Sequence, residues 1–536
     1  MKNIKTNILA AAFASLSVMG ISSCSDFLEE MPKTALTPEQ VFTELKVLEP
    51  TVDGLYTSYR ESKKGRDGFT FTLLGLDESK QGIVQITTEA TQPGLDYYNG
   101  LLNATSPQIS SMWYKRWPMI NSAALSIRGL ELLSEVATDG ETLQKIKLLR
   151  ANACFMRAMS MFEMTMYWGE IPVIEIIDLD NPDIDMSRKS LDIVWKQIFD
   201  DLTYASENLD DGRQTGPRAT KGAAIAMLGK IHMYAPVESG FRDFSKAISY
   251  FEKIKGNYNL ESSYEKMFDE YATLEFNSNE SIFEIDFICN SSGPSHWQWD
   301  MGSRTLAGLG ESCYIGGWDV VLPTEYAYKM NSEGGVWEEG DSRRDASMRF
   351  DYTYHGQEYT VPSWGADELD PHVKKWEDRR LDKWTSNALA AEATSGRSMY
   401  WSGKNYMYLR FADILLCYAE CLNETGRTGE AIEIVNQVRT RAWGGNLPAD
   451  KRWSGLSQDQ FRTDIMDERM RELCFEGWRR MDLIRTGNFV KLIKERNPWA
   501  KEKGSIQDFH VRWPIPEDEI KNNPYMEMGL DQNPGY

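Results

Sequence analysis

The strongest constraint on the fold comes from residues 410–442, where apolar side chains recur with a helical period. In the first half of this stretch, the positions that share one helical face are Phe411, Ile414, Leu415, Tyr418 and Leu422. Gly426 ends this helix, and Thr428 can cap the N-terminus of a second one. The second helix has its own apolar stripe at Ala431, Val435, Val438 and Ala442. The stretch therefore predicts two antiparallel helices joined by a tight turn.

Small residues at two positions of this hairpin suggest how closely the helices approach. Ala419 and Ala431 lie twelve positions apart, which is the spacing of the close contact in a tetratricopeptide-type hairpin, although other helical hairpins share part of the pattern. Such a hairpin buries only one side of itself, so partner hairpins must exist elsewhere in the chain. We therefore predict a mainly α fold on a tetratricopeptide-like scaffold of helical hairpins.

Helical periodicity covers most of the N-terminal half of the chain. We expect helices at residues 38–59, 106–136, 141–168, 191–209, 220–234 and 244–254. The segment 149–168 carries a Met- and Phe-rich stripe that suits core packing. Ala247 and Phe251 repeat the A-x3-F step of tetratricopeptide-type hairpins.

A loop-rich region interrupts the helices. Between residues 281 and 401 the helical period fades, Gly, Pro, Ser and Asp become frequent, and short strand-like pieces such as 282–288 appear. We expect a single domain over residues 38–536. Its parts are a helical scaffold at 38–280 and 402–491, a loop-rich aromatic insert containing short strands at 281–401, and a C-terminal tail at 492–536.

The N-terminus has the pattern of an export signal. Lys2 and Lys5 precede an apolar run over residues 8–21, which is too short for a resident membrane helix. Small residues then lead to Cys24, as at a lipoprotein cleavage site, although an ordinary secretory signal could carry a cysteine there. We expect a signal peptide at 1–23, lipidation at Cys24 and a tether at 24–37. Acyl chains on that cysteine would hold the protein on a membrane.

Several ordered motifs in the C-terminal part resemble one known family. They are ERMRELCFEGWRRMDLIRTG at 468–487, PIPEDEI at 514–520, QNPGY at 532–536 and VRTRA, which closes the hairpin, at 438–442. The segment 149–174 carries a further similar motif. Together they resemble the SusD/RagB family of nutrient-binding lipoproteins on the outer membrane of Bacteroidetes-type bacteria.

The resemblance implies a function and a partner. Family members bind a nutrient such as an oligosaccharide or polysaccharide, and sit as a lid over a SusC-like TonB-dependent transporter. The resemblance therefore implies a non-catalytic glycan-binding protein that hands its ligand to the transporter at the cell surface. A family member with a peptide ligand would show the same motifs. Neither the motifs nor the resemblance calls for a cofactor.

The charge of the chain excludes one class of ligand. Lys and Arg total 59 against 80 Asp and Glu, so the formal net charge is −21, and it becomes −23 without the signal peptide. An acidic surface of this size repels a phosphate backbone. We therefore expect no nucleic-acid partner.

The insert is enriched in tryptophan. Eight of the 17 tryptophans lie between residues 297 and 401, so aromatic surface is concentrated outside the helical scaffold. Sugar-binding sites need flat aromatic rings beside amide and carboxylate groups. The loops around Trp297, Trp299 and Trp318 supply both. In the family, the ligand site is an exposed aromatic arc drawn from this insert and from the loop before the second helix pair.

In this chain that earlier loop contains Tyr97, Tyr98 and Asn99. We predict a ligand site formed by Tyr97, Tyr98, Asn99, Trp297, Trp299 and Trp318. Any one tryptophan could instead pack beneath a long loop. We expect Trp376, Trp384 and Trp401 to be buried in this way.

Carboxylates at a helical spacing raise the question of catalysis. Glu468, Glu472 and Glu476 recur every four residues, which would stack them on one helix face at about the separation used by retaining glycosidases. Arginines alternate with them, as expected for ion pairs that tie the helix to its neighbours. We therefore predict no enzyme, and a lipid-anchored glycoside hydrolase is the rival that glycan turnover would reveal.

Neither cysteines nor acidic residues indicate a metal site. Cys154, Cys417, Cys421 and Cys474 lie in helical patterns and are expected to be buried free thiols, whereas Cys289 and Cys313 could pair across a loop. The acidic loop at 178–185 lacks the Gly and Glu spacing of a calcium-binding loop. We expect no bound metal.

Overall fold

The computed structural model describes residues 44–174, 184–268, 276, 278–287, 293–303, 317–349, 371–377 and 402–536, together with the backbone of 351–354 and 357–360. The lipidation position Cys24, most of the acidic loop and the pair Cys289 and Cys313 lie outside these residues. So do Trp384 and Trp401, which were expected to be buried.

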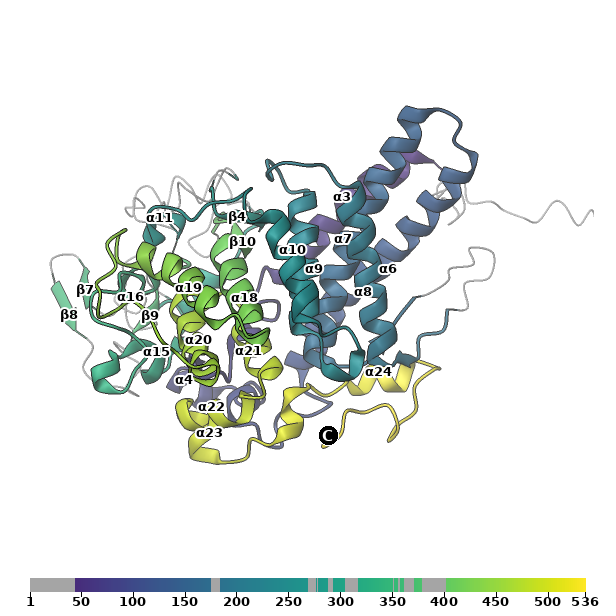
Figure 1. The fold of residues 1–536 in the computed structure, drawn as a ribbon. Coiled ribbons are helices and arrows are strands. Elements are labelled where there is room, and N and C mark those ends of the chain that lie inside the picture. The colour runs from purple at the N-terminus through teal and green to yellow at the C-terminus, as the bar shows by residue number, and fades with distance from the viewer. Residues whose placement is uncertain are drawn as a thin grey trace, which may run out of the picture.

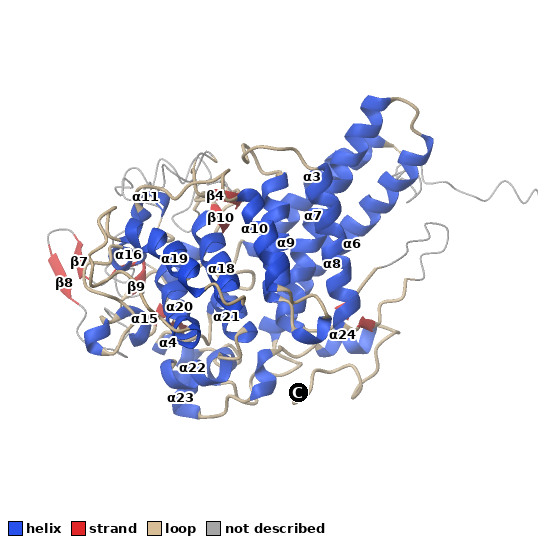
Figure 2. Ribbon diagram, viewed as in Figure 1, coloured by secondary structure: helices blue, strands red, loops and turns tan. Residues whose placement is uncertain are grey.

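Long helices form the N-terminal half, as the sequence predicts (Figures 1 and 2). Each packs on the next from α6 to α10, and α3 lies against α6 and α7. Helices α6 and α7 project beyond the body as an exposed hairpin tip (Figure 1). The helices are α3 (Leu45–Lys63), α6 (Pro107–Val136), α7 (Gly140–Trp168), α8 (Leu191–Asn208), α9 (Lys221–Tyr234) and α10 (Phe244–Ile254).

The predicted C-terminal hairpin is α18 (Phe411–Glu424) and α19 (Thr428–Ala442). Ala419 and Ala431 are fully buried, and Gly426 adopts a positive φ of 80°, which ends α18. The turn differs in one detail, because α19 starts at Thr428, whose hydroxyl donates to Asn423 Oδ1 (2.8 Å) and does not cap the helix. Helix α10 packs against α18 and joins the two helical groups.

Shorter helices follow the hairpin and lead to the C-terminus. They are α20 (Gln458–Leu473), α21 (Arg479–Arg485), α22 (Phe489–Arg496), α23 (Pro498–Lys503) and α24 (Glu517–Asn522). Residues 505–536 then run back along the end of α7, where the Trp513 ring stacks on Tyr167 at 4.6 Å. Asn533 of the QNPGY motif donates to the carbonyls of Trp168 (2.9 Å) and Trp513 (2.7 Å). This motif therefore fastens the C-terminal tail to the scaffold.

Short elements dominate the insert, the segment before α6 and several connections between the longer helices. The helices are α4 (Ile83–Thr88), α5 (Gly94–Tyr97), α11 (Tyr264–Phe268), α13 (Trp297–Met301), α15 (Glu325–Tyr328) and α16 (Arg343–Ser347). The strands form antiparallel pairs: β1 (Ser79–Lys80) with β5 (Leu322–Pro323), β2 (Ile171–Pro172) with β3 (Arg188–Lys189), β4 (Ser281–Ile285) with β10 (Tyr406–Arg410), β6 (Met348–Arg349) with β9 (His372–Val373), and β7 (Asp351–Tyr354) with β8 (Gln357–Thr360).

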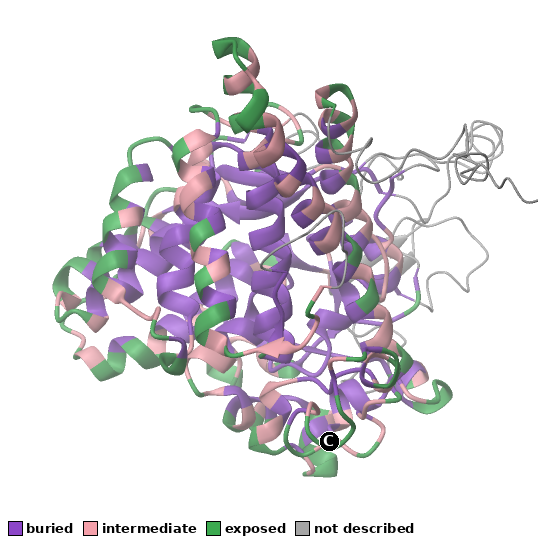
Figure 3. Cartoon of the chain, turned by 90° about the vertical axis from the view of Figure 1, so that its right-hand side faces the viewer, coloured by how far each residue is buried: buried purple, intermediate pink, exposed green. Residues whose placement is uncertain are grey.

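The core runs through the helical layers (Figure 3). Every residue of α7 from Ala151 to Trp168 is buried, which confirms that its Met and Phe stripe is core packing. Cys154, Cys417, Cys421 and Cys474 are buried free thiols, as predicted, although Cys474 lies just past the end of α20. Trp376 is also buried, with 3% of its surface exposed. None of the described helices combines the length and hydropathy needed to cross a lipid bilayer.

Candidate functional site

The structure corrects two of the six predicted ligand residues. Trp297 is 1% exposed, donates its indole N–H to the carbonyl of Lys63 (2.8 Å) and packs edge to face against Trp376 and Tyr406. Tyr98 is also 1% exposed, and its hydroxyl donates to the carbonyl of Gly75 (2.6 Å). Both rings have their polar atoms satisfied inside the protein, so they belong to the core and cannot face a ligand.

Trp318 is the predicted ligand residue that the structure exposes most clearly. It is 42% exposed and lies beside the partly exposed Trp299, whose carbonyl accepts a hydrogen bond from Trp318 N (2.9 Å). Gly317 makes this approach possible, because a Cβ there would lie 2.3 Å from the carbonyl oxygen of Trp299. Backbone bonds to Gly302 and Ser303 hold the same turn in place.

The Arg66 guanidinium adjoins the Trp318 ring, and the next residue along the chain, Asp67, belongs to a second ion pair. The Arg66 guanidinium lies 5.8 Å from the ring centroid, and its Nε is 3.2 Å from Asp300 Oδ1. Burial raises the pKa of Asp300, against the opposing charge of Arg66. The side chains of Asp67 and Lys115 are about one third exposed and form an ion pair. We call Arg66, Asp67, Lys115, Trp299 and Trp318 the Trp318 surface.

A buried amide network holds the Trp318 surface to the rest of the fold. Gln85 Nε2 on α4 donates to the Trp318 carbonyl (2.8 Å), and Gln92 Nε2 donates to the side-chain oxygens of Gln85 (3.2 Å) and Gln81 (2.8 Å). Gln81 Nε2 in turn donates to Asp96 Oδ2 (2.6 Å). Burial raises the pKa of Asp96 to about 6. The backbone of Trp318 is thereby held in place by a side-chain amide that is itself part of a hydrogen-bonded network.

Tyr97 and Asn99 lie in a different environment from the Trp318 ring. Tyr97 is partly exposed, and its ring meets that of Trp499 edge to face at 6.5 Å. Asn99 is partly exposed, and its side-chain oxygen accepts from Leu101 N (3.1 Å). The structure thus brings Trp299 and Trp318 together but associates Tyr97 with Trp499, which is not among the predicted ligand residues.

The Trp318 surface has the chemistry of a saccharide site. An exposed indole face can stack on the C–H face of a pyranose, while a guanidinium, a carboxylate and an ammonium can bond its hydroxyl groups. Partial burial would raise the pKa of Asp67, but hydrogen bonds from Lys115 and Ser111 lower it, so the carboxylate is an acceptor at neutral pH. Such an arrangement can hold a saccharide by stacking and hydrogen bonding.

The carboxylates that suggested catalysis are structural. Glu468 and Glu472 are fully buried on α20, and Glu476 lies beyond the end of that helix at Leu473, so the three do not share one helix face. All three belong to a buried ion-pair network, as the alternating arginines indicated. Its members are Glu280, Glu338, Asp341, Glu468, Glu472 and Glu476 with Arg343, Lys375, Arg410, Arg439, Arg441 and Arg471.

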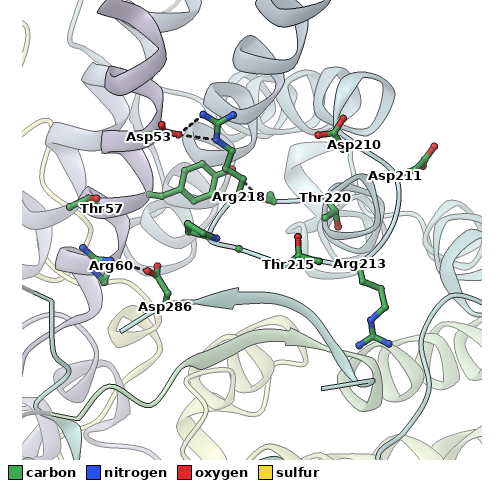
Figure 4. A pocket seen from close by; sticks show the side chains of 14 residues that line it. Asp53, Thr57, Arg60, Asp210, Asp211, Arg213, Thr215, Arg218, Thr220 and Asp286 are labelled. Atoms are coloured by element: carbon green, nitrogen blue, oxygen red, sulfur yellow. Dashed lines mark hydrogen bonds and ion pairs between the residues drawn. The ribbon is translucent and has the colours of Figure 1, made fainter. Parts of the chain in front are cut away.

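A separate pocket of about 590 Å³ lies between α3, the N-terminus of α9 and the residue after β4 (Figure 4). Four of its charged groups form ion pairs with each other, Arg218 with Asp53 (2.6 Å) and Arg60 with Asp286 (3.1 Å). The aromatic ring that lines it, Tyr56, is only 7% exposed. This pocket is therefore poorer in stacking surface than the Trp318 surface. Among the described residues, no cluster of three or more His, Cys, Asp or Glu could hold a metal ion.

Comparison with known families gives matches over both halves of the chain. A model described as the SusD family matches residues 279–536, and one described as starch-binding associating with outer membrane matches residues 26–233. The SusD-like protein P2 of Formosa agariphila is 28% identical over 97% of this chain and 98% of its own length. The starch-binding protein SusD of Bacteroides thetaiotaomicron is 24% identical over 100% of this chain and 99% of its own length.

Solved structures share the fold. A SusD homolog from Bacteroides thetaiotaomicron superposes with a TM-score of 0.75 at 20% identity, over 93% of this chain and 98% of that one. A laminarin-binding SusD-like protein superposes with a TM-score of 0.70 at 22% identity, over 92% and 99%. Surface glycan-binding protein A from Bacteroides fluxus gives a TM-score of 0.69 at 20% identity, over 92% and 100%.

Proposed function

The chain belongs to the SusD/RagB family, and from this premise we propose that it is a surface glycan-binding protein whose ligand contacts the Trp318 surface. Relatives are described as binding starch, laminarin or surface glycans. The observation that carries the proposal is the exposed Trp318 ring with the Arg66 guanidinium 5.8 Å from its centroid. The protein holds the glycan without cleaving it.

The proposed function also includes a lipid anchor at the N-terminus and delivery of the glycan to a transporter. Cys24 is the lipidated residue after removal of residues 1–23, residues 24–37 form the tether, and 38–536 form one domain. The match of residues 26–233 to a model described as associating with the outer membrane supports this location. At the cell surface the protein passes its glycan to a SusC-like TonB-dependent transporter.

The test is retardation of the lipid-free protein in affinity gels that contain starch, laminarin, xylan, mannan or a uronate-rich polysaccharide. Retardation by one of them, with no shortening of its chains, is the expected result. Shortening of the chains would indicate a hydrolase. Failure of every glycan to retard the protein would refute glycan binding and favour a peptide ligand.

Trp318→Ala locates the site. An aromatic side chain buries about 150–250 Å² when fully covered, so its 42% exposed fraction offers roughly 60–100 Å² to a ligand. At about 25 cal/mol per Å² this contact contributes about 2 kcal/mol, which corresponds to a roughly 30-fold loss of affinity. The matched control is Tyr114→Ala on α6, which is 41% exposed and lines another pocket. Equal losses in both variants would place the ligand elsewhere.

A further inference from the structure

A second aromatic pocket of about 510 Å³ is bounded by β1, α15, α22 and α23. The partly exposed ring of Trp499 forms one wall. Tyr326 lines it too, with the Arg496 guanidinium 3.6 Å from its ring centroid. We call this the Trp499 pocket. Its chemistry parallels that of the Trp318 surface, because both combine an accessible indole with a guanidinium.

The polar atoms of both rings are committed to the protein. Trp499 donates its indole N–H to the Gln81 carbonyl (2.7 Å), and Tyr326 donates its hydroxyl to Asp467 Oδ2 (2.7 Å). Asp467 also contacts Arg496 (3.2 Å). These bonds fix the walls before a ligand arrives, which reduces the entropy lost on binding. The rings therefore offer apolar surface, and hydrogen bonding falls to other groups.

The rim of the pocket carries charges of both signs. Glu495 and Lys501 are exposed, and the exposed Glu325 is paired with Lys329 (2.7 Å). Hydroxyl groups both donate and accept hydrogen bonds, so a ligand rich in them can use such a mixed rim. A ligand with a single strong charge would be attracted by some of these groups and repelled by others, so the rim does not select for it. The lining therefore matches a neutral sugar.

From these observations we infer that the Trp499 pocket is a second saccharide-binding site, which takes a neutral pyranose unit of a glycan chain. The inference rests on the proposed glycan-binding function. Both sites are attached to one backbone segment, since Gly82 N donates to the Asp319 carbonyl (3.0 Å) beside Trp318, and the Gln81 carbonyl accepts from Trp499. Tyr97, which packs against Trp499, then supports this second site.

The test compares Trp318→Ala, Trp499→Ala and the double variant in affinity gels with the polysaccharides named above. Each single variant is expected to retain part of the retardation. Adding Trp499→Ala to Trp318→Ala should weaken the residual binding by roughly tenfold or more, because a stacked tryptophan typically dominates its contact. Since Trp499 also packs on Tyr97, the rim variant Glu495→Ala with Lys501→Ala tests the pocket without altering a ring. The exposed Lys491→Ala on α22 is its control.

The outcomes separate the two proposals. If the wild type binds a glycan and both the Trp499 and rim variants bind it equally well, the second site is refuted and the proposed function stands. If Trp499→Ala abolishes binding but Trp318→Ala has no effect, the Trp499 pocket is supported and the Trp318 surface is refuted. A wild type that binds none of the polysaccharides refutes both.

Discussion

Glu472→Gln tests whether the buried ion-pair network holds the insert onto the scaffold. The Glu472 carboxylate accepts from Arg410 (2.5 Å), Arg343 (3.0 Å) and Arg441, and none of these side chains is more than 4% exposed. Burial by itself would raise the pKa of Glu472, but the three arginine charges outweigh it and hold the pKa well below its usual range. The carboxylate is therefore ionised at neutral pH.

The size of the effect follows from the charge balance. The network contains six carboxylates and six cations, so the substitution leaves one buried positive charge without a counterpart. Glutamine keeps an acceptor oxygen of nearly the same shape, so packing changes little. Removing one partner of a buried pair costs about 3–5 kcal/mol. We expect the free energy of unfolding to fall by that amount.

Equilibrium urea unfolding, followed by tryptophan fluorescence, measures the loss as a shift in the midpoint at constant slope. The control is Glu430→Gln, whose ion pair with Arg427 (2.7 Å) joins side chains that are 60% and 40% exposed. Because solvent screens this exposed pair, its loss should change the free energy of unfolding far less than the loss of Glu472. Equal losses in the two variants would refute the claim that the network stabilises the fold.

Two further predictions concern buried positions, one on β4 and one on α9. Burial raises the pKa of Glu284 from 4.5 to about 7, so the folded state binds the extra proton between these values and stability falls as the pH rises through them. Glu284→Gln should therefore be more stable than wild type by about 1–3 kcal/mol in urea unfolding at about pH 8. At about pH 5 the two proteins should be equally stable. If they are equally stable at both pH values, the raised pKa of Glu284 is refuted. Gly229→Ala on α9 should cost about 1–3 kcal/mol in thermal unfolding, because its Cβ would lie 2.3 Å from the Phe251 ring. The control Gly54→Ala on α3 meets no atom within 4 Å and should be neutral or stabilising.

The helical scaffold could be predicted because its signals are local. The stripes that define α18 and α19 repeat every three or four residues, and a helix is formed by bonds between residues four apart. The same reasoning located α6 to α10 and the buried cysteines. It failed at Glu476, because the helix period continues in the sequence past Leu473, where the structure ends α20.

The candidate site was only partly predictable. The tryptophan-rich loops can be recognised from composition, but nothing in the sequence distinguishes Trp297 from Trp318. Trp297 is buried because Trp376 and Tyr406 pack against it. These residues are distant in sequence, so no local pattern around residue 297 predicts the contact. Trp499 was missed because it follows a proline in a short helix with no motif to mark it.

The sequence by itself determined the family, the mainly α scaffold and the presence of aromatic loops. Motif order, helical period and composition depend only on residues that are near one another in the chain. The tertiary structure alone decided which rings remain exposed. The exposed area of a ring depends on which distant segments pack against it. Trp499, for example, contacts Gln81 and Tyr97, which lie some 400 positions earlier in the sequence. Burial of a ring lowers the free energy in proportion to the area covered, so the packing of the whole chain sets which surfaces a ligand can still cover.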